Sequence, residues 1–280
     1  MRQRKIKNED EKIAAFSRYI IEEPESWKGR WAECFVQKCG EAAGAKEPAT
    51  DGANGGADES AGNTGAVRAA SAETMITANG TAHESAGNTG AAGSGGFGEL
   101  KEPEEKKEIY LEIGCGKGRF ITTLAQRNPD KRYIAVEGAR SVALRALEKA
   151  DEKGLSNLVF ILDYVNDLED LFQRGEVAGI YLNFSDPWPK DRHAKRRLTH
   201  SRYLQSYKRI LKPGSFIEFK TDNDGLFAFS AAEMRENGLE IVEYTEDLHA
   251  SVYGRKNVPT EYEDKFRKLW KKINYCKARV

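Results

Sequence analysis

The chain has 280 residues, and its 44 Lys and Arg residues balance 44 Asp and Glu residues at a formal net charge of zero. No apolar run approaches the ~18 residues of a membrane span, and residues 1–5 (MRQRK) lack the apolar core of a signal peptide. The four cysteines are too few and too scattered for a disulfide framework or a four-ligand zinc site. These exclusions favour a cytoplasmic protein with reduced thiols, without a metal site and without membrane contact.

Residues 1–40 are interpreted as an N-terminal arm. A helical pattern covers residues 10–21, and Trp27, Trp31 and Phe35 then recur at a spacing of four residues. This spacing places the three rings on one face of a short helix. We expect that face to pack against the main domain.

Residues 41–108 have a composition of their own. They contain half of the 26 glycines, a single aromatic residue (Phe97) and two copies of ESAGNTGA, at 59–66 and 84–91. Without large apolar side chains the segment cannot offset the entropy of ordering. We expect a disordered, acidic, low-complexity insertion that links the arm to a domain at 109–280. Outside it, 39 Lys and Arg face 32 Asp and Glu, a net charge of +7 that points to nucleic acid.

A strand at 109–113 and a helix at 117–127 are joined by glycines at alternate positions, Gly114, Gly116 and Gly118. Such glycines let a ligand approach the backbone closely, and the helix N-terminus offers it free N–H groups. The dinucleotide fingerprint G-x-G-x-x-G opens the same kind of unit. Here the third glycine comes one residue early and Glu112 precedes the turn. This form resembles motif I of S-adenosylmethionine-dependent methyltransferases.

The next strand, at 132–136, is followed by Glu137, about 20 residues after the glycines, where an acid binds ribose hydroxyls in such folds. A solvated strand end is the alternative interpretation of Glu137. The glycine turn upstream favours the ribose interpretation.

Strands and helices alternate after residue 109, which predicts a parallel sheet covered by helices. Further strands are expected at 158–162, 178–184, 215–221 and 239–245, with an edge strand at 273–279. Further helices are expected at 139–153, 166–173, 201–212, 224–236 and 260–270. The pattern predicts an α/β, doubly wound, Rossmann-like fold with seven strands and helices on both faces. Ligands bind such sheets at the carboxyl ends of the strands.

The strand at 178–184 leads into Asp186-Pro-Trp-Pro-Lys190. The two prolines disfavour a helix, so Asp186 is expected beside the cofactor cleft, and the flat ring of Trp188 is suited to stacking on a base. Residues 190–197 (KDRHAKRR) contain five Lys or Arg, and residues 265–280 contain seven with no acidic side chain. A charge run is usually a solvated face. At the rim of a cleft it predicts contacts with nucleic-acid phosphates.

Four ordered motifs, NFSDPWPK at 183–190, RHAKRRL at 192–198, FKTDN at 219–223 and TEYEDKF at 260–266, resemble the bacterial tRNA (guanine-N7)-methyltransferases. The resemblance implies a class I methyltransferase that uses S-adenosylmethionine to methylate N7 of a guanine in the variable loop of tRNA. It implies cofactor contacts from Glu112, Gly114, Gly116, Gly118, Glu137 and Asp186, and substrate contacts from Lys190, Asp222, Thr260 and Glu263. One departure concerns the adenine. The family usually has Asp-Ala where this chain has Tyr164-Val165, so Asp163 or Asn166 is left to supply the polar contact beside Tyr164.

The expected mechanism needs no general base, because guanine N7 has an in-plane lone pair and no proton to lose. Catalysis is then mainly positioning, and Asp186 and Asp222 are the carboxylates expected to stabilise the developing positive charge. A non-catalytic RNA-binding protein on the same fold is the main rival, disfavoured by the intact acids. An NAD-dependent oxidoreductase is the other, disfavoured by the glycine spacing and the basic rim. The sequence does not distinguish a monomer from a homodimer.

Overall fold

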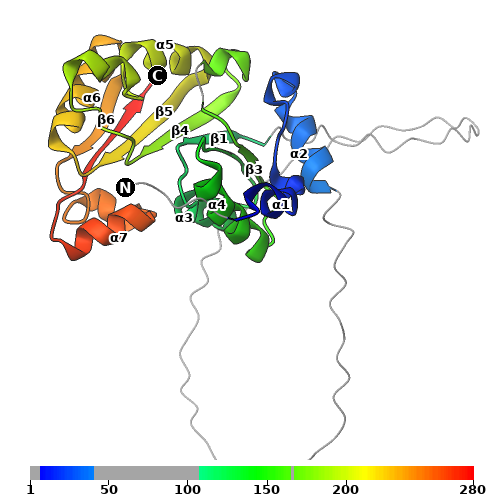
Figure 1. Ribbon diagram of the computed structural model, residues 1–280. Helices are drawn as coiled ribbons and strands as arrows, with labels where there is room; N and C mark the ends of the chain where they lie inside the picture. The colour runs from blue at the N-terminus through cyan, green and yellow to red at the C-terminus, as the bar shows by residue number, and fades with distance from the viewer. Residues whose placement is uncertain (1–6, 41–106, 165–166) are drawn as a thin grey trace, which may run out of the picture. The chain divides into compact units, whose positions relative to one another are not determined.

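The computed structural model describes residues 7–40, 107–164 and 167–280. The insertion expected at 41–108 lies outside these residues except for its last two. The described residues contain a seven-stranded sheet of order β3-β2-β1-β4-β5-β7-β6 (Figure 1). Its strands are β1 Ile109–Ile113, β2 Arg132–Val136, β3 Leu158–Ile161, β4 Val177–Asn183, β5 Leu211–Thr221, β6 Glu240–Thr245 and β7 Asn274–Arg279. This order confirms the predicted doubly wound α/β fold.

Strands β1 to β5 pair in parallel, whereas β7 lies antiparallel between β5 and β6. The prediction that 273–279 is an edge strand is therefore wrong, because β6 occupies the edge. Burial explains the order. β7 buries Asn274, Tyr275, Cys276 and Ala278 between its two neighbours, while β6 alternates exposed and half-buried residues, as suits a strand with water along one side.

Both faces of the sheet are covered, and successive strand residues point to opposite faces. On β1, Leu111 joins a core with α2 (Trp31–Gly40), α5 (Ser201–Ile210) and α6 (Asp224–Glu236). Tyr110 joins a second core with α1 (Glu9–Ala14), α3 (Arg119–Arg127) and α4 (Arg140–Glu152). The remaining helix, α7 (Glu261–Lys268), lies at one end of the sheet in Figure 1.

Two segments depart most from the predicted helices. The segment expected to be helical at 166–173 has only a 3-10 turn at Leu168–Asp170, and the arm helix expected at 10–21 stops at Ala14 before a second 3-10 turn at Ser17–Tyr19. The arm then runs beside β3, where the N–H group of Ile21 donates to the carbonyl of Phe160 at 2.9 Å. Further along, Nε1 of buried Trp31 donates to the carbonyl of Leu171 at 2.9 Å. The arm therefore packs on the sheet edge.

Candidate active site

The glycine turn after β1 has open space above its first two glycines. Gly114 has φ +77° and Gly116 has φ +57°, and a Cβ atom added at either position meets nothing within 4 Å. The N–H group of Gly114 donates to the carbonyl of Val136 at 2.8 Å, which ties the turn to the end of β2. Gly118 differs, because a Cβ atom there lies 2.4 Å from that of Ala146. The first two glycines leave room for a ligand, and the third lets α3 pack closely on α4.

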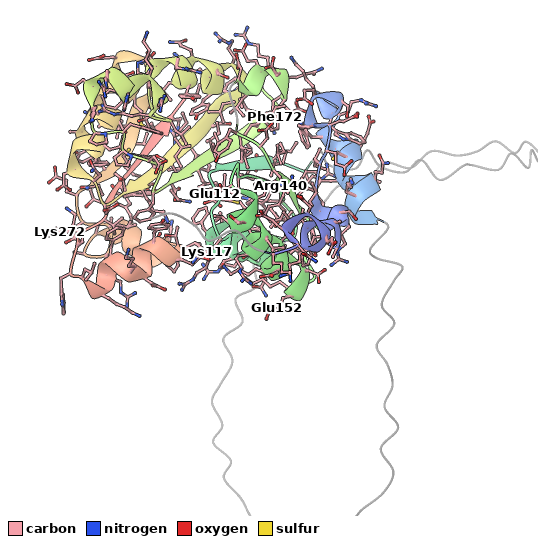
Figure 2. The ribbon with its side chains drawn as sticks, in the orientation of Figure 1. Glu112, Lys117, Arg140, Glu152, Phe172 and Lys272 are labelled. Carbon is pink, nitrogen blue, oxygen red and sulfur yellow. The ribbon has the colours of Figure 1, made fainter. Side chains whose placement is uncertain are left out.

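Glu112 lies inside the molecule near the end of β1 (Figure 2). Its Oε1 atom accepts a hydrogen bond of 2.7 Å from Nδ2 of Asn183 on β4, whereas Oε2 is buried without a hydrogen-bond partner among the described residues. Burial raises the pKa of Glu112 to about 8, although the hydrogen bond from Asn183 and the charge of Lys220 oppose this rise. A buried acceptor without a partner is costly, so Glu112 suits a cationic or donating group that enters at the glycine turn.

Glu137, directly after β2, is held by two backbone N–H groups. Oε2 accepts from Gly116 and Oε1 from Ala139, each at 2.9 Å. Each oxygen keeps a second lone pair, so the carboxylate is oriented and can still accept from a ligand hydroxyl. The ring of Tyr164 lies against Gly138, where an added Cβ atom meets the ring at 2.5 Å. Tyr164 is 71% exposed, so most of its ring is open to a ligand.

A pocket of about 390 Å³ lies between the N-terminal arm and the carboxyl end of β3. Asp10 of the arm and Arg140 of α4 line it together with Asp163, and Arg140 pairs with Asp10 at 3.4 Å. Oδ1 of Asp163 accepts from the N–H group of Tyr164 at 2.6 Å. The arm thus forms one wall of a cavity beside the expected cofactor residues, which no sequence pattern indicated. The predictions for Val165 and Asn166 lie outside the described residues.

Asp186 stands exposed in the loop after β4, between two aromatic residues with left-handed backbones. Phe184 has φ 52° and Trp188 has φ 41°. The Phe184 ring stacks on Tyr262 and Phe266 of α7, with centroid distances of 6.3 and 6.2 Å. These contacts fix the loop against α7 and leave the Asp186 carboxylate in solvent.

The basic run after this loop contains both exposed and buried side chains. Lys190 and Arg196 are exposed, and the Arg196 guanidinium lies 4.8 Å from the ring centroid of Trp188. Arg197 is 9% exposed and donates to the carbonyls of Pro187 and Trp188, at 3.2 and 3.1 Å. The prediction that the whole run contacts phosphates is therefore wrong for Arg197, because its side chain is buried and donates to the loop.

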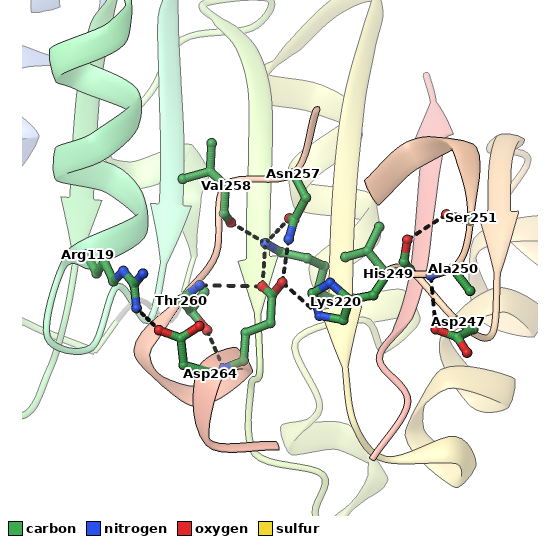
Figure 3. Close-up of polar contacts among 12 residues, drawn as sticks. Arg119, Lys220, Asp247, His249, Ala250, Ser251, Asn257, Val258, Thr260 and Asp264 are labelled. Carbon is green, nitrogen blue, oxygen red and sulfur yellow. Dashed lines mark hydrogen bonds and ion pairs between the residues drawn. The ribbon is translucent and has the colours of Figure 1, made fainter. Parts of the chain in front are cut away.

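A polar network joins β5 to α7 (Figure 3). Lys220 and Glu263 are fully buried in it, Asn257 is half-buried, and His249 lies at its exposed end. Nζ of Lys220 lies 3.5 Å from Oε2 of Glu263 and donates to Oδ1 of Asn257 at 3.1 Å and to the carbonyl of Val258 at 2.9 Å. Oε1 of Glu263 accepts from Asn257 and lies 3.2 Å from Nε2 of His249. Burial lowers the pKa of Lys220, and the Glu263 charge opposes this. Both carboxylate oxygens of Glu263 therefore have partners inside the protein.

Thr260 begins α7 with a capping box. Its Oγ1 atom accepts from the N–H group of Glu263 at 3.0 Å, and Oε2 of Glu263 accepts from the N–H group of Thr260 at 3.4 Å. Both side chains are buried, so these two expected substrate residues do not reach the surface. Asp222, directly after β5, is half-buried.

Two ion pairs join α7 to the helices around the glycine turn. Asp264 pairs with Arg119 at the start of α3, and Glu261 pairs with Lys149 of α4. Nζ of Lys149 also donates to the carbonyl of Lys117 in the turn, at 2.6 Å. The structure thus brings the expected substrate segment to the expected cofactor segment. No role was predicted for Lys149 or Arg119, because a local sequence pattern does not indicate an ion pair between residues more than 100 positions apart.

Comparison with known proteins agrees with this arrangement. Residues 106–276 match a protein-family model described as a putative methyltransferase. The chain is 48% identical over 171 residues to the tRNA (guanine-N7)-methyltransferase of Clostridioides difficile strain 630, which covers 61% of this chain and 79% of that relative. The chain belongs to the tRNA (guanine-N7)-methyltransferase family. The resemblance drawn from the four motifs is confirmed.

Two further proteins are similar to this methyltransferase. The tRNA (guanine-N7)-methyltransferase of Clostridium acetobutylicum is 44% identical over 180 residues, 64% of this chain and 85% of that relative. Among solved structures, the 16S rRNA methyltransferase KamB is 14% identical with a TM-score of 0.48, and the match covers 62% of this chain and 88% of that one.

The helices of the described residues were also compared with the length and hydropathy that a membrane span requires. None of them meets both requirements.

Proposed function

We propose that this methyltransferase transfers the methyl group of S-adenosylmethionine to N7 of a guanine in the variable loop of tRNA. The observation that carries the proposal is the buried Oε2 atom of Glu112, which has no hydrogen-bond partner in the described part of the chain and belongs to the residue two before the open glycine turn. A cationic cofactor suits this acceptor. The relatives support the substrate, since their names state the guanine N7 of tRNA.

The residues around the glycine turn fit S-adenosylmethionine. When bound, it supplies a methyl group already activated by the sulfonium charge. We assign Glu112 to its cationic amino end, Glu137 to the ribose hydroxyls and the open face of Tyr164 to the adenine. The remaining cofactor contacts in this proposal come from Gly114, Gly116, Gly118, Asp163 and Asp186.

The substrate side is assigned by exposure. Exposed Lys190 binds tRNA phosphate, while Asp186 and Asp222 stabilise the charge that develops on the guanine ring. No side chain has to remove a proton from N7. Thr260 and Glu263 are buried, so in this proposal they act by fixing the start of α7 beside the cofactor turn.

The proposal includes tRNA as the macromolecular partner, a cytoplasmic location and a monomer or homodimer. It is tested by incubating the full chain with unmodified tRNA and methyl-labelled S-adenosylmethionine, followed by nucleoside analysis. Label in 7-methylguanosine supports it, and the label is lost from a matched transcript in which adenosine replaces the variable-loop guanosine. A chain that binds tRNA and transfers no label is instead a non-catalytic RNA-binding protein.

A further inference from the structure

Trp270 is 95% exposed, more than any other large apolar side chain in the described part of the chain. It stands in the turn between α7 and β7. A tryptophan ring that packs in a protein removes roughly 150–250 Å² from water, and this ring forgoes almost all of that stabilisation. Single exposed apolar residues are common, so exposure needs a second observation before it indicates function.

The backbone of Trp270 supplies that observation, because it adopts a conformation that favours glycine. Its φ is 56°. The N–H group of Trp270 donates to the carbonyl of Arg267, and that of Lys271 to the carbonyl of Phe266, each at 3.1 Å. This bond pair is the Schellman C-cap, whose left-handed residue is usually glycine. A bulky residue in this position is strained, and strain that a fold retains is concentrated at functional sites.

Basic residues are frequent in the segment that carries the ring. Lys265, Arg267 and Lys268 are exposed on α7. Lys272, which is exposed after α7 at the edge of the molecule in Figure 2, pairs with Asp247 at 3.6 Å. No acidic side chain occurs between residue 265 and the last residue of the chain. Nζ of Lys271 pairs with Asp224 at 3.0 Å, which ties the turn to the start of α6. The indole is thus held on an anchored turn that directly follows the three exposed cations of α7.

We propose that Trp270 is a stacking platform for an unpaired base of the tRNA, with Lys265, Arg267 and Lys268 binding the adjoining phosphates; this inference rests on the proposed function. Aromatic rings beside cations bind single-stranded nucleic acid whatever the base, because every base has a flat face. The eight residues of α7 span about 12 Å, and the helix starts beside the glycine turn. The stacked base is therefore a neighbour of the target guanine and not the target.

The same surface does not suit a protein partner. A stable protein interface buries about 800 Å² on each side, and its centre is apolar and poor in charge. Here one indole stands in a segment, residues 265–272, that has five Lys and Arg residues, of which Lys271 and Lys272 pair with acidic side chains. Nucleic acid matches both the ring and the charge.

The test compares variants in tRNA binding, methyl transfer and thermal unfolding. Trp270→Ala is expected to raise the Kd for unmodified tRNA about 5- to 100-fold, because one stacked base is lost. Its salt slope and its kcat at saturating tRNA stay unchanged, whereas Lys268→Ala flattens the slope. Trp270→Phe keeps most of the affinity. The control is Val252→Ala, since Val252 is 75% exposed outside α7, and it binds like the parent chain.

Trp270→Gly separates stacking from structure. It binds tRNA as weakly as Trp270→Ala, yet it unfolds at a higher temperature, because glycine relieves the left-handed strain that alanine keeps. If the parent chain methylates tRNA and Trp270→Ala binds tRNA equally well, the assignment of Trp270 as a stacking platform is wrong and the proposed function stands. If the parent chain does not methylate tRNA, the proposed function is itself wrong, whatever the Trp270 variants show. A change from dimer to monomer in Trp270→Ala, with tRNA affinity intact, shows a protein interface and overturns the inference.

Discussion

The ammonium group of Lys220 lies 3.5 Å from the carboxylate of Glu263, and both side chains are fully buried. Removing one partner of such a pair leaves the other charge uncompensated, which typically costs about 3–5 kcal/mol. Glu263→Ala is therefore expected to lower the free energy of unfolding by that amount in urea denaturation. At temperatures where the variant is folded, turnover falls more than tRNA affinity, because α7 loses its fixed start beside the cofactor turn.

Glu152→Ala is the matched control for this variant, since Glu152 is exposed on α4 and its loss changes stability by less than about 0.5 kcal/mol. The double variant Lys220→Met with Glu263→Ala recovers part of the loss, because no charge is left buried. A Glu263→Ala protein as stable as the control contradicts this account of the network.

Glu112 makes cofactor affinity depend on pH. Its pKa is about 8 in the fold against 4.5 without burial, so between these values the folded protein holds a proton that the unfolded chain releases. Stability therefore falls as pH rises through this window, and Glu112→Gln removes the fall, a difference on the order of a few kcal/mol at pH 8. Cationic S-adenosylmethionine favours the charged carboxylate, so its affinity for the parent chain rises from pH 6 to 8.

Calorimetry in two buffers with different ionisation enthalpies measures the proton that Glu112 releases on binding. Glu112→Gln is expected to bind weakly, with no dependence on buffer. Equal proton release by both proteins rules out Glu112 as the source.

Asp186→Ala is expected to abolish most methyl transfer while the fold is kept. Asp186 is exposed, so its removal leaves no cavity, and the loss of one charge-stabilising group costs about 10²- to 10³-fold in kcat. Single-turnover rates with labelled cofactor measure the effect, and circular dichroism checks the fold. Asp191→Ala, another exposed acid in the same loop region, serves as the control. A near-parental rate for Asp186→Ala removes it from the mechanism.

Arg196 and Arg197 are neighbours with opposite expected effects. Arg196→Ala removes an exposed cation, so each lost phosphate contact lowers the salt slope of log affinity by about 0.7–0.9 with stability unchanged. Arg197→Ala frees the carbonyls of Pro187 and Trp188, so it lowers thermal stability and kcat and keeps the salt slope. Salt titrations and melting curves on both variants measure these effects. A flattened salt slope for Arg197→Ala contradicts the assignment of Arg197 to the loop.

Replacement of residues 41–106 by a short Gly/Ser linker is expected to leave cofactor affinity and methyl transfer within about twofold of the parent chain. The segment has a composition that offers no core, and shortening a loop changes closure entropy only slowly. Isothermal titration and tRNA methylation measure the result. Loss of cofactor binding identifies the segment as part of the catalytic structure.

Local patterns predicted much of the fold for a physical reason. The strands at 109–113 and 132–136 are short apolar runs that end at glycine or an acid, and their observed bounds agree with the prediction. The helix at 224–236 agrees as well, because the side chain of Asn223 caps it and Gly238 follows it. The helix expected at 166–173 fails, since Leu168 and Phe172 have helical spacing yet are buried around a single 3-10 turn.

Partners that lie far apart along the chain explain what the sequence could not predict. The Asn183 amide reaches Glu112 across 71 residues, and Lys220 reaches Glu263 across 43. The basic residues at 190–197 are chemically alike, so the sequence does not show that Arg197 is buried and Arg196 exposed. The position of β7 inside the sheet could not be predicted for the same reason, because it depends on pairing with β5 and β6, which lie earlier in the chain.

The place of β7 also sets the order in which the sheet is completed during synthesis. Within the described sheet β6 pairs only with β7, and the ribosome makes β7 after β6 and α7. Until residues 274–279 emerge, β5 presents an open edge, which is a template for pairing with other chains. β7 is made after the other six strands of the described sheet and fills the place between β5 and β6. A nascent chain paused before it is therefore the form most exposed to aggregation.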